Sequence, residues 1–270
     1  MEYVTVDELE IPALGLGTYQ LRGEQCVESV ATAIELGYRH IDTAEFYENQ
    51  REVGRAIADS LIDEDELFIT TKVWRTNLAA EDVHESARRS REKIGIDSID
   101  LLLIHWPSRT VPIRETIGAM NELQDAGVVD HIGVSNFSVG QLEEAMDVSR
   151  TPIVANQVKY HPYHEQGELL AASLEHDVML TSYSPLAKGS VLDDDTLARI
   201  GDRYGKSAAQ IALRWLVQQD LVAAIPKATG RDHLAANLDI FDFSLTDEEM
   251  EAVFDLQGGL LASLRSRLGL

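Results

Sequence analysis

The sequence is poor in the features that mark secreted and membrane-embedded proteins. Its 270 residues include a single cysteine, Cys26, so no internal disulfide can form and a reducing compartment is expected. No apolar run approaches the roughly eighteen residues of a membrane span, and the N-terminal stretch MEYVTVDELEIP lacks the basic and apolar segments of a signal peptide. We therefore expect a soluble, cytoplasmic protein.

Positive charge is scarce, and lysine is the scarcer of the two basic residue types. The chain holds 46 acidic residues against 23 basic ones, which gives a net charge of −23. Such a field repels nucleic acids and anionic membranes, so neither is expected as a partner. Only six of the basic residues are lysines and seventeen are arginines. This combination predicts a halophilic protein, with an ordinary acidic mesophilic protein as the alternative.

Two hydrophobic periods alternate along nearly the whole chain. Short apolar runs, typical of buried strands, are followed by segments in which apolar residues recur every three or four positions, typical of helices. The expected strands span residues 14–19, 38–42, 67–73, 99–105, 131–135, 153–158, 178–184 and 221–226, and the expected helices span residues 24–36, 51–61, 80–94, 113–126, 139–149, 167–176 and 207–219.

These eight strand–helix units define the expected fold class. Strands apolar enough to be covered on both faces predict a parallel (β/α)8 TIM barrel, which we expect to form a single domain over residues 1–270. An open doubly wound sheet is the alternative, but the Rossmann fingerprint is absent because Gln20 stands where its third glycine is required. Gly37 and Gly127 are expected to end helices, and Ser138 and Ser207 to begin them.

The end of the chain departs from the repeating pattern. Thr246 and Glu249 form a capping-box pattern that predicts an extra helix at about residues 246–256. The tail that follows, residues 257–270, contains no acidic residue. In so acidic a chain this shift predicts either a tail docked on the barrel or a frayed terminus.

Polar residues gather where the predicted strands end, which is where barrel active sites form. Asp42 ends the second strand, Lys72 lies near the end of the third, and His105 ends the fourth. Each residue alone has an ordinary explanation, since His105 could be a core histidine, Asp42 a turn cap and Lys72 a solvated strand end. The barrel would nevertheless bring all of them onto one face.

Tyr47 lies in the stretch D-T-A-E-F-Y-E-N-Q, residues 42–50, among carboxylates. A phenol with a pKa of about 10 is too weak a proton donor for efficient general acid catalysis. We expect Lys72 to lower the pKa of Tyr47 and Asp42 to orient Lys72, while Glu45 and Glu48 point outwards as part of the acidic surface. His105 would then hydrogen-bond a carbonyl oxygen that gains negative charge, which predicts addition to a carbonyl.

The same residues are compatible with other chemistries. A barrel isomerase or lyase using His105 and a carboxylate, without a cofactor, remains an alternative. The run H-P-Y-H at residues 161–164 has the density of a metal site, but acidic partners do not follow in order, so no metal is expected.

Eight ordered motifs then point to a known family. They are GLGTY (15–19), YRHIDTAEFYEN (38–49), ITTKVW (69–74), LLLIHWP (101–107), IGVSNF (132–137), NQVKYHP (156–162), YSPL (183–186) and IPKAT (225–229). In these motifs the chain resembles the aldo-keto reductases, and in particular the short-tailed prokaryotic members similar to 2,5-diketo-gluconate reductase and aldehyde reductase. The resemblance implies NAD(P)H-dependent reduction of an aldehyde or ketone to the alcohol.

The resemblance also assigns roles to individual residues. It implies a catalytic tetrad of Asp42, Tyr47, Lys72 and His105, in which Tyr47 gives the proton while hydride comes from the nicotinamide. It implies an apolar substrate pocket walled by Tyr19, Trp74 and Trp106. The implied cofactor contacts are Gly17, Thr18, Ser135, Asn136, Gln157, Tyr183, Ser184, Pro185, Leu186, Lys227, Ala228, Thr229, His233 and Asn237.

The adenosine end of this cofactor site departs from the family pattern. Ala228, His233 and Ala236 stand where the family usually has serine, arginine and glutamate. Lys227 and the nearby Arg231 still make a small basic site, so NADPH is expected, with NADH or dual use as the alternative. A monomer is expected by family analogy. A non-catalytic nicotinamide-binding regulatory or partner subunit of the same fold is the alternative function, although the complete tetrad argues against it.

Overall fold

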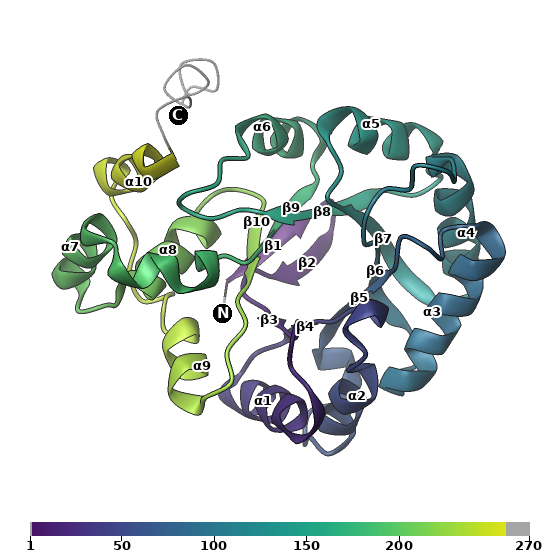
Figure 1. Ribbon diagram of the computed structural model, residues 1–270, viewed down its shortest axis with the longest axis horizontal. Helices are drawn as coiled ribbons and strands as arrows, with labels where there is room; N and C mark the ends of the chain where they lie inside the picture. Colours follow the sequence, from purple (N-terminus) through teal and green to yellow (C-terminus); the bar gives the residue numbers. More distant parts are fainter. Residues whose placement is uncertain (1, 258–270) are drawn as a thin grey trace.

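A computed structural model describes residues 2–257 of the chain, and its centre is a barrel of eight parallel strands (Figure 1). Neighbouring strands in the sheet are also neighbours in the sequence, from the first barrel strand to the last. All eight predicted strands are present, so the predicted (β/α)8 barrel is confirmed. The strands are β3 (Leu16–Gly17), β4 (His40–Asp42), β5 (Phe68–Val73), β6 (Ile99–Ile104), β7 (Val129–Ser135), β8 (Ile153–Lys159), β9 (Met179–Tyr183) and β10 (Val222–Ile225).

The barrel closes between its first and last strands. Gly15 donates a backbone hydrogen bond to Ala224 at 2.9 Å, and Gly17 donates one to Pro226 at 3.1 Å. A Cβ atom on Gly17 would lie 2.6 Å from the backbone oxygen of Ile225, so only glycine lets the two strands come this close. The close approach places the loop after β3 beside the loop after β10.

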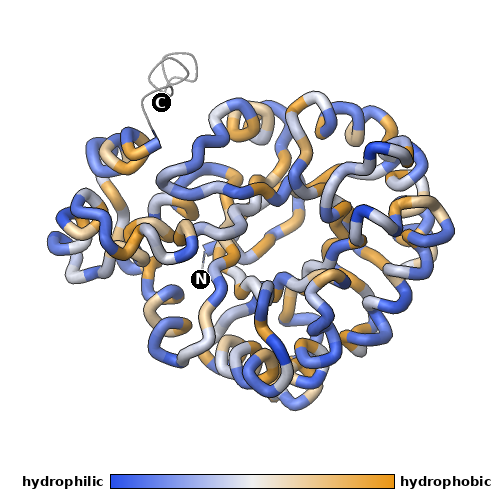
Figure 2. The backbone as a smooth tube through the Cα atoms, viewed as in Figure 1, coloured by the Kyte–Doolittle hydropathy of each residue, from blue (hydrophilic) through white to orange (hydrophobic). Residues whose placement is uncertain are grey.

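Helices form a ring around the strands (Figure 1) and turn their apolar residues towards them (Figure 2). Three of the four predicted ends lie as expected: Gly37 is a left-handed C-cap, and Ser138 and Ser207 open capping boxes. Gly127, at a φ of 65°, lies one residue after the C-cap Ala126. The helices of the barrel units are α1 (Gly23–Leu36), α2 (Gln50–Ala58), α3 (Ala80–Ile94), α4 (Ile113–Asp125), α5 (Val139–Val148), α6 (Gly167–His176) and α8 (Ala208–Val217), with 3-10 turns η1 (Glu45–Tyr47), η2 (Glu64–Glu66), η3 (Ala187–Asp193) and η4 (Asp255–Gln257).

Several elements were not predicted from the sequence. An antiparallel hairpin of β1 (Tyr3–Val6) and β2 (Leu9–Pro12) lies at the amino end of the barrel, where Asp7 donates a backbone hydrogen bond to Asp177 at 2.8 Å. Helices α7 (Asp195–Tyr204) and α9 (Arg231–Leu238) were also missed. The first has an apolar face that includes Leu197 and Ile200, which sequence reasoning overlooked, whereas the second has no clear apolar face.

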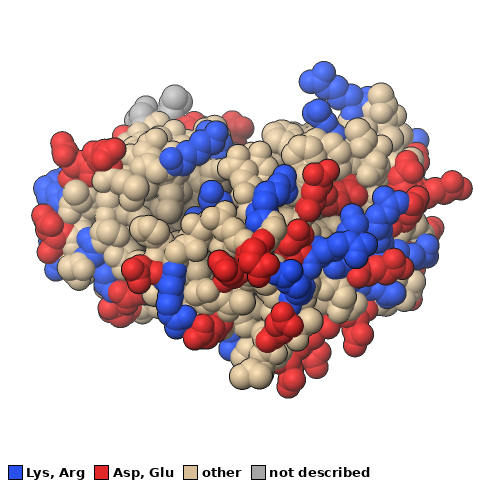
Figure 3. All heavy atoms as spheres, turned by 60° about the horizontal axis from the view of Figure 1, so that its bottom comes forward, with Lys and Arg blue, Asp and Glu red and all other residues tan. Residues whose placement is uncertain are grey.

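The predicted C-terminal helix is present as α10 (Asp247–Phe254), opened by the expected capping box of Thr246 and Glu249. The predicted tail, except for residue 257, lies outside the described residues. Figure 3 shows acidic side chains over the face it presents, with lysine and arginine side chains between them. No helix in residues 2–257 is long and apolar enough to cross a membrane.

Candidate active site

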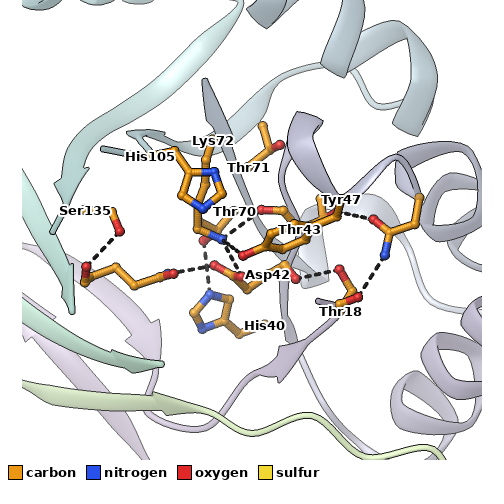
Figure 4. Close-up of polar contacts among 12 residues, drawn as sticks. Thr18, His40, Asp42, Thr43, Tyr47, Thr70, Thr71, Lys72, His105 and Ser135 are labelled. Atoms are coloured by element: carbon orange, nitrogen blue, oxygen red, sulfur yellow. Dashed lines mark hydrogen bonds and ion pairs between the residues drawn. The ribbon is translucent and has the colours of Figure 1, made fainter. Parts of the chain in front are cut away.

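A buried ion pair stands at the carboxyl end of β4 and β5 (Figure 4). Asp42 is the last residue of β4, and Lys72 is the penultimate residue of β5. Each is 1% exposed, and Lys72 Nζ lies 2.5 Å from Asp42 Oδ1. The ammonium also donates to the carbonyl oxygen of Thr43 at 2.9 Å, while Gln157 Nε2 donates to Asp42 Oδ2 at 2.8 Å. Burial lowers the pKa of Lys72, and the carboxylate of Asp42 opposes that shift.

Tyr47 completes this cluster from the 3-10 turn that follows β4. Lys72 Nζ donates to its hydroxyl oxygen at 3.3 Å, so the predicted contact between this phenol and a lysine on another strand is present. The expected direction of the pKa shift is wrong, however. Burial raises the pKa of Tyr47 well above its ordinary value, and Asp42 raises it further. The phenol is 8% exposed and therefore keeps its proton at neutral pH.

His105 directly follows β6 and faces the same space. Its ring lies 5.6 Å from the ring of Tyr47 and 4.9 Å from that of Trp74, both edge to face. Burial, and then the charge of Lys72, lowers the pKa of His105 to about 3, so the imidazole is neutral. Its buried Nδ1 atom has no partner within residues 2–257. A neutral imidazole can donate one hydrogen bond to a carbonyl oxygen without carrying charge into the site.

Polar residues of the next three strands form a connected network beside this cluster. Ser135 Oγ donates to the carbonyl oxygen of Gln157 at 2.8 Å. Asn136 donates to Ser135 Oγ and to the backbone oxygen of His105, each at 3.0 Å, and accepts from the Tyr183 hydroxyl at 2.9 Å. Asn136 adopts a φ of 62°, an uncommon conformation for a side chain with a Cβ, and such positions concentrate at functional sites. The ring of Tyr183 is thereby anchored and half-buried.

The remaining expected cofactor residues lie at the end of β3, in loops at the same end of the barrel and, for His233 and Asn237, on α9. Thr18 donates through Oγ1 to the carbonyl oxygen of Asp42 at 2.9 Å. Ser184, at a φ of 53°, begins the loop that continues through Pro185 and Leu186. At the adenosine end, the residues divide into an exposed set and a buried set: Lys227, Thr229 and His233 are exposed, whereas Ala228 and Asn237 are buried.

The expected basic site at the adenosine end has less unpaired positive charge than the sequence suggested. The guanidinium of Arg231 makes two hydrogen bonds to the carboxylate of Glu35 on α1, at 2.8 and 3.2 Å. Glu35 is far from Arg231 in the sequence, so the pattern around Lys227 gave no sign of this pairing. Lys227 is therefore left as the cation without a carboxylate partner in the described part of this loop.

Exposed aromatic residues surround His105 and Tyr47 on the other side of the site. Tyr19 is 51% exposed and Trp106 41% exposed, and the ring of Tyr19 lies 5.1 Å from that of Tyr47. Sequence reasoning missed Phe46, which is 46% exposed and stacks on Trp74 with ring centroids 4.0 Å apart. Its position, beside Tyr47 and after a strand, was the available signal.

Two other residues of the stretch 42–50 have structural roles that sequence reasoning did not assign. Asn49 Nδ2 donates to the backbone oxygens of Thr18 and Leu21 at 2.9 and 3.2 Å, which ties the loop after β3 to the loop after β4. Glu45 was expected to point outwards, and this is wrong. Its carboxylate accepts hydrogen bonds from the backbone N–H of Trp74 and, at 3.1 Å, from Asn77 Nδ2.

The histidine run at 161–164 forms no metal cluster. His161 and His164 face each other with ring centroids 5.6 Å apart, but His161 Nδ1 already accepts the backbone N–H of Tyr163 at 3.1 Å. Within residues 2–257, no three side chains of the metal-binding types are close enough to hold an ion.

Comparison with known proteins agrees with this geometry. Residues 13–257 match the model of the aldo/keto reductase family. An aldo-keto reductase of Mycolicibacterium paratuberculosis is 40% identical over 94% of this chain and 88% of its own length. The methylglyoxal reductase DkgB of Escherichia coli O157:H7 is 38% identical, with coverage of 91% and 92%. A crystal structure assigned as a 2,5-diketo-D-gluconic acid reductase B superposes with a TM-score of 0.93 at 46% identity, covering 95% of this chain and 91% of that one.

A closed parallel barrel with polar residues at its carboxyl end defines a barrel enzyme. The chain belongs to the aldo/keto reductase family, and it is an oxidoreductase of the carbonyl-reducing kind. Enzymes of this family use NAD(P)H in general.

Proposed function

We propose that this protein reduces an aldehyde or ketone to the alcohol with Tyr47 as the proton donor. The observation that carries the proposal is the contact of the Tyr47 hydroxyl with Lys72, which is itself paired with Asp42. The phenol is protonated at neutral pH because burial raises its pKa. The buried ammonium stabilises the phenolate only as the proton leaves, which assists transfer in the transition state.

His105 is suited to bind the carbonyl oxygen of the substrate. It faces Tyr47, is neutral, and can donate a hydrogen bond to an oxygen that gains negative charge. Two donors, the imidazole and the phenol, would then meet at one oxygen, and the surrounding aromatic rings would exclude water. The substrate would lie against Tyr19, Trp74, Trp106 and Phe46, which together favour an apolar carbonyl compound.

The residues of β7 to β9 fit a nicotinamide cofactor. Tyr183 offers a flat ring fixed through its hydroxyl by Asn136, which suits stacking on a flat heterocycle. Ser135, Asn136 and Gln157 supply amide and hydroxyl groups that can bond a carboxamide, and Ser184, Pro185 and Leu186 would follow the pyrophosphate together with Gly17 and Thr18. Bound there, the reduced nicotinamide supplies a hydride to the carbonyl carbon.

For the cofactor preference we propose NADPH with weak discrimination against NADH. Lys227, Thr229 and His233 are exposed and can meet a 2′-phosphate, while Ala228 and Asn237 are buried and offer it little. Arg231 is occupied by Glu35. Releasing it should strengthen phosphate binding, so Glu35→Gln is expected to raise the affinity for NADPH relative to NADH about two- to fivefold. Fluorescence titration of both nucleotides measures this ratio.

The matched control is Glu24→Gln, which removes a carboxylate from the same helix. Glu24 pairs with Arg55 instead. An unchanged NADPH/NADH ratio in Glu35→Gln, or an equal change in the Glu24 variant, would contradict this account of the preference.

The catalytic proposal is tested by following oxidation of reduced nicotinamide with a panel of aldehydes. Methylglyoxal is the first choice because DkgB is a methylglyoxal reductase. Tyr47→Phe is expected to lower kcat by about 10²–10⁴-fold and leave nucleotide binding unchanged, because it removes a proton donor and little volume. Full activity of Tyr47→Phe would rule out the proton-donor role. Nucleotide binding without turnover of any carbonyl by the wild type would favour the non-catalytic alternative.

A further inference from the structure

The carboxylate of Glu45 links the two loops that carry the proposed proton donor and one wall of the pocket. Glu45 opens the 3-10 turn that ends at Tyr47. Its carboxylate accepts hydrogen bonds from two residues of the turn after β5, the backbone N–H of Trp74 and the side chain of Asn77. Asn77 in turn donates its backbone N–H to the carbonyl oxygen of Trp74 at 2.9 Å. One carboxylate therefore holds both ends of the turn after β5.

The aromatic wall depends on the same two loops. Phe46, the residue after Glu45, stacks on Trp74 with ring planes 16° apart. Trp74 meets the edge of His105 at 4.9 Å. Phe46 and Trp74 come from different loops, so their stack requires that the loops keep a fixed separation. The hydrogen bonds of Glu45 fix it.

Besides the bonds of Glu45, the wall is contacted by the guanidinium of Arg75, which lies over the Trp74 ring at 5.3 Å, but it is not closely packed from behind. A cavity of about 220 Å³ lies beside Phe46 and Trp74, and its lining includes Glu45, Glu48 and Asn77. Phe46 remains 46% exposed despite its stacking. A side chain with an open cavity behind it is not held by close packing on that side, so its position depends on its ring contacts and on the hydrogen bonds that hold the two loops together.

We propose that Glu45 is a positioning residue that holds the Phe46–Trp74 wall and thereby sets how well large, flat carbonyl compounds bind. The inference rests on the proposed reductase function. Glu45 touches neither the reacting atoms nor the Tyr47 hydroxyl, which Lys72 holds independently at 3.3 Å. Losing Glu45 should therefore impair binding of substrates that reach the wall and spare the chemistry of small ones.

The experiment compares two aldehydes that differ in reach, methylglyoxal and 2-naphthaldehyde. In Glu45→Ala, KM for 2-naphthaldehyde is expected to rise about tenfold, the effect of losing one charged hydrogen-bonded link. For methylglyoxal, kcat and KM should each stay within about twofold of the wild type. Glu45→Gln, whose amide oxygen can accept the same hydrogen bonds, should restore most of the binding. Acrylamide should quench the tryptophan fluorescence of Glu45→Ala more strongly than that of the wild type.

The matched control is Glu48→Ala. Glu48 borders the same cavity and carries the same charge, but its carboxylate has no hydrogen-bond partner in residues 2–257. It should behave as the wild type with both substrates. Equal losses on both aldehydes in Glu45→Ala, or no selective loss on the larger one, would overturn the inference. Failure of the proposed function is a different result, in which the wild type reduces neither aldehyde.

Discussion

Removing both charges of the buried ion pair of Asp42 and Lys72 should cost less stability than the two single losses added together. Each side chain is 1% exposed, and Lys72 places its ammonium between Asp42, Thr43 and Tyr47. Lys72→Met leaves the Asp42 carboxylate buried with the hydrogen bond of Gln157 alone. Asp42→Asn leaves a buried ammonium without its counter-ion. Each single change creates an uncompensated charge in the core.

The expected magnitude follows from that burial. Removing one partner of a buried ion pair costs about 3–5 kcal/mol, because the remaining charge is desolvated and unpaired. The double variant Asp42→Asn with Lys72→Met contains neither charge. We expect it to be at least about 2–3 kcal/mol more stable than the sum of the single losses predicts, which is the size of coupling found between contacting groups.

Urea unfolding at pH 7 and fixed ionic strength, followed by circular dichroism, measures the four free energies of this cycle. The wild type and three variants must show equal m values for the comparison to hold. The exposed pair of Glu24 and Arg55 provides a second cycle, which should couple far more weakly. Additivity within about 0.5 kcal/mol in the Asp42–Lys72 cycle would refute the view that these charges depend on each other.

Two further predictions concern stability away from the site. Burial raises the pKa of Asp100 from 3.8 to about 7, so the folded protein loses stability as pH rises from about 4 through 7. A rise in pKa of this size corresponds to about 4 kcal/mol before solvent screening, so Asp100→Asn should remove this slope and add roughly 2–4 kcal/mol at pH 8, as measured by urea unfolding across pH. A slope in Asp100→Asn equal to that of the wild type would contradict it. A Cβ on Gly54 would lie 2.0 Å from the backbone oxygen of Ile94, so Gly54→Ala should destabilise by about 1–3 kcal/mol, whereas Gly118→Ala, in open space on α4, should be neutral or stabilising; equal thermal denaturation of the two variants would contradict this packing argument.

The barrel could be predicted because its elements have local signals. The segment FITTKV is buried at every position in β5, and its apolar and β-branched residues, all but Lys72, already indicate a strand covered on both faces. Capping residues such as Ser138 and Thr246 marked helix starts in the same local way. The hairpin of β1 and β2 has no such signal, because its two four-residue strands gain stability from the barrel end that they cover.

The sequence predicted which residues form the site, but it predicted only some of the contacts between them. The carboxyl ends of the strands in a parallel barrel share one face, so the sequence predicts that Asp42, Lys72 and His105 lie near one another. Whether Glu45 faces solvent or the next loop, by contrast, depends on which backbone N–H group lies opposite it. Trp74 is distant in the sequence, and the bond to its backbone leaves no trace in residue type.

The sequence by itself determined the alternation of strands and helices, the family, and the residue types placed at the barrel mouth, because these depend on periodicity and order along the chain. Only the tertiary structure decided how the stretch 42–50 divides its acidic residues. Asp42 is buried against Lys72, Glu45 bonds the turn after β5, and Glu48 remains exposed. The tertiary structure also reversed the expected direction of the Tyr47 pKa shift. Burial of the phenol raises its pKa, and the degree of burial depends on how closely other strands enclose the ring, which the neighbouring residues in the chain do not show.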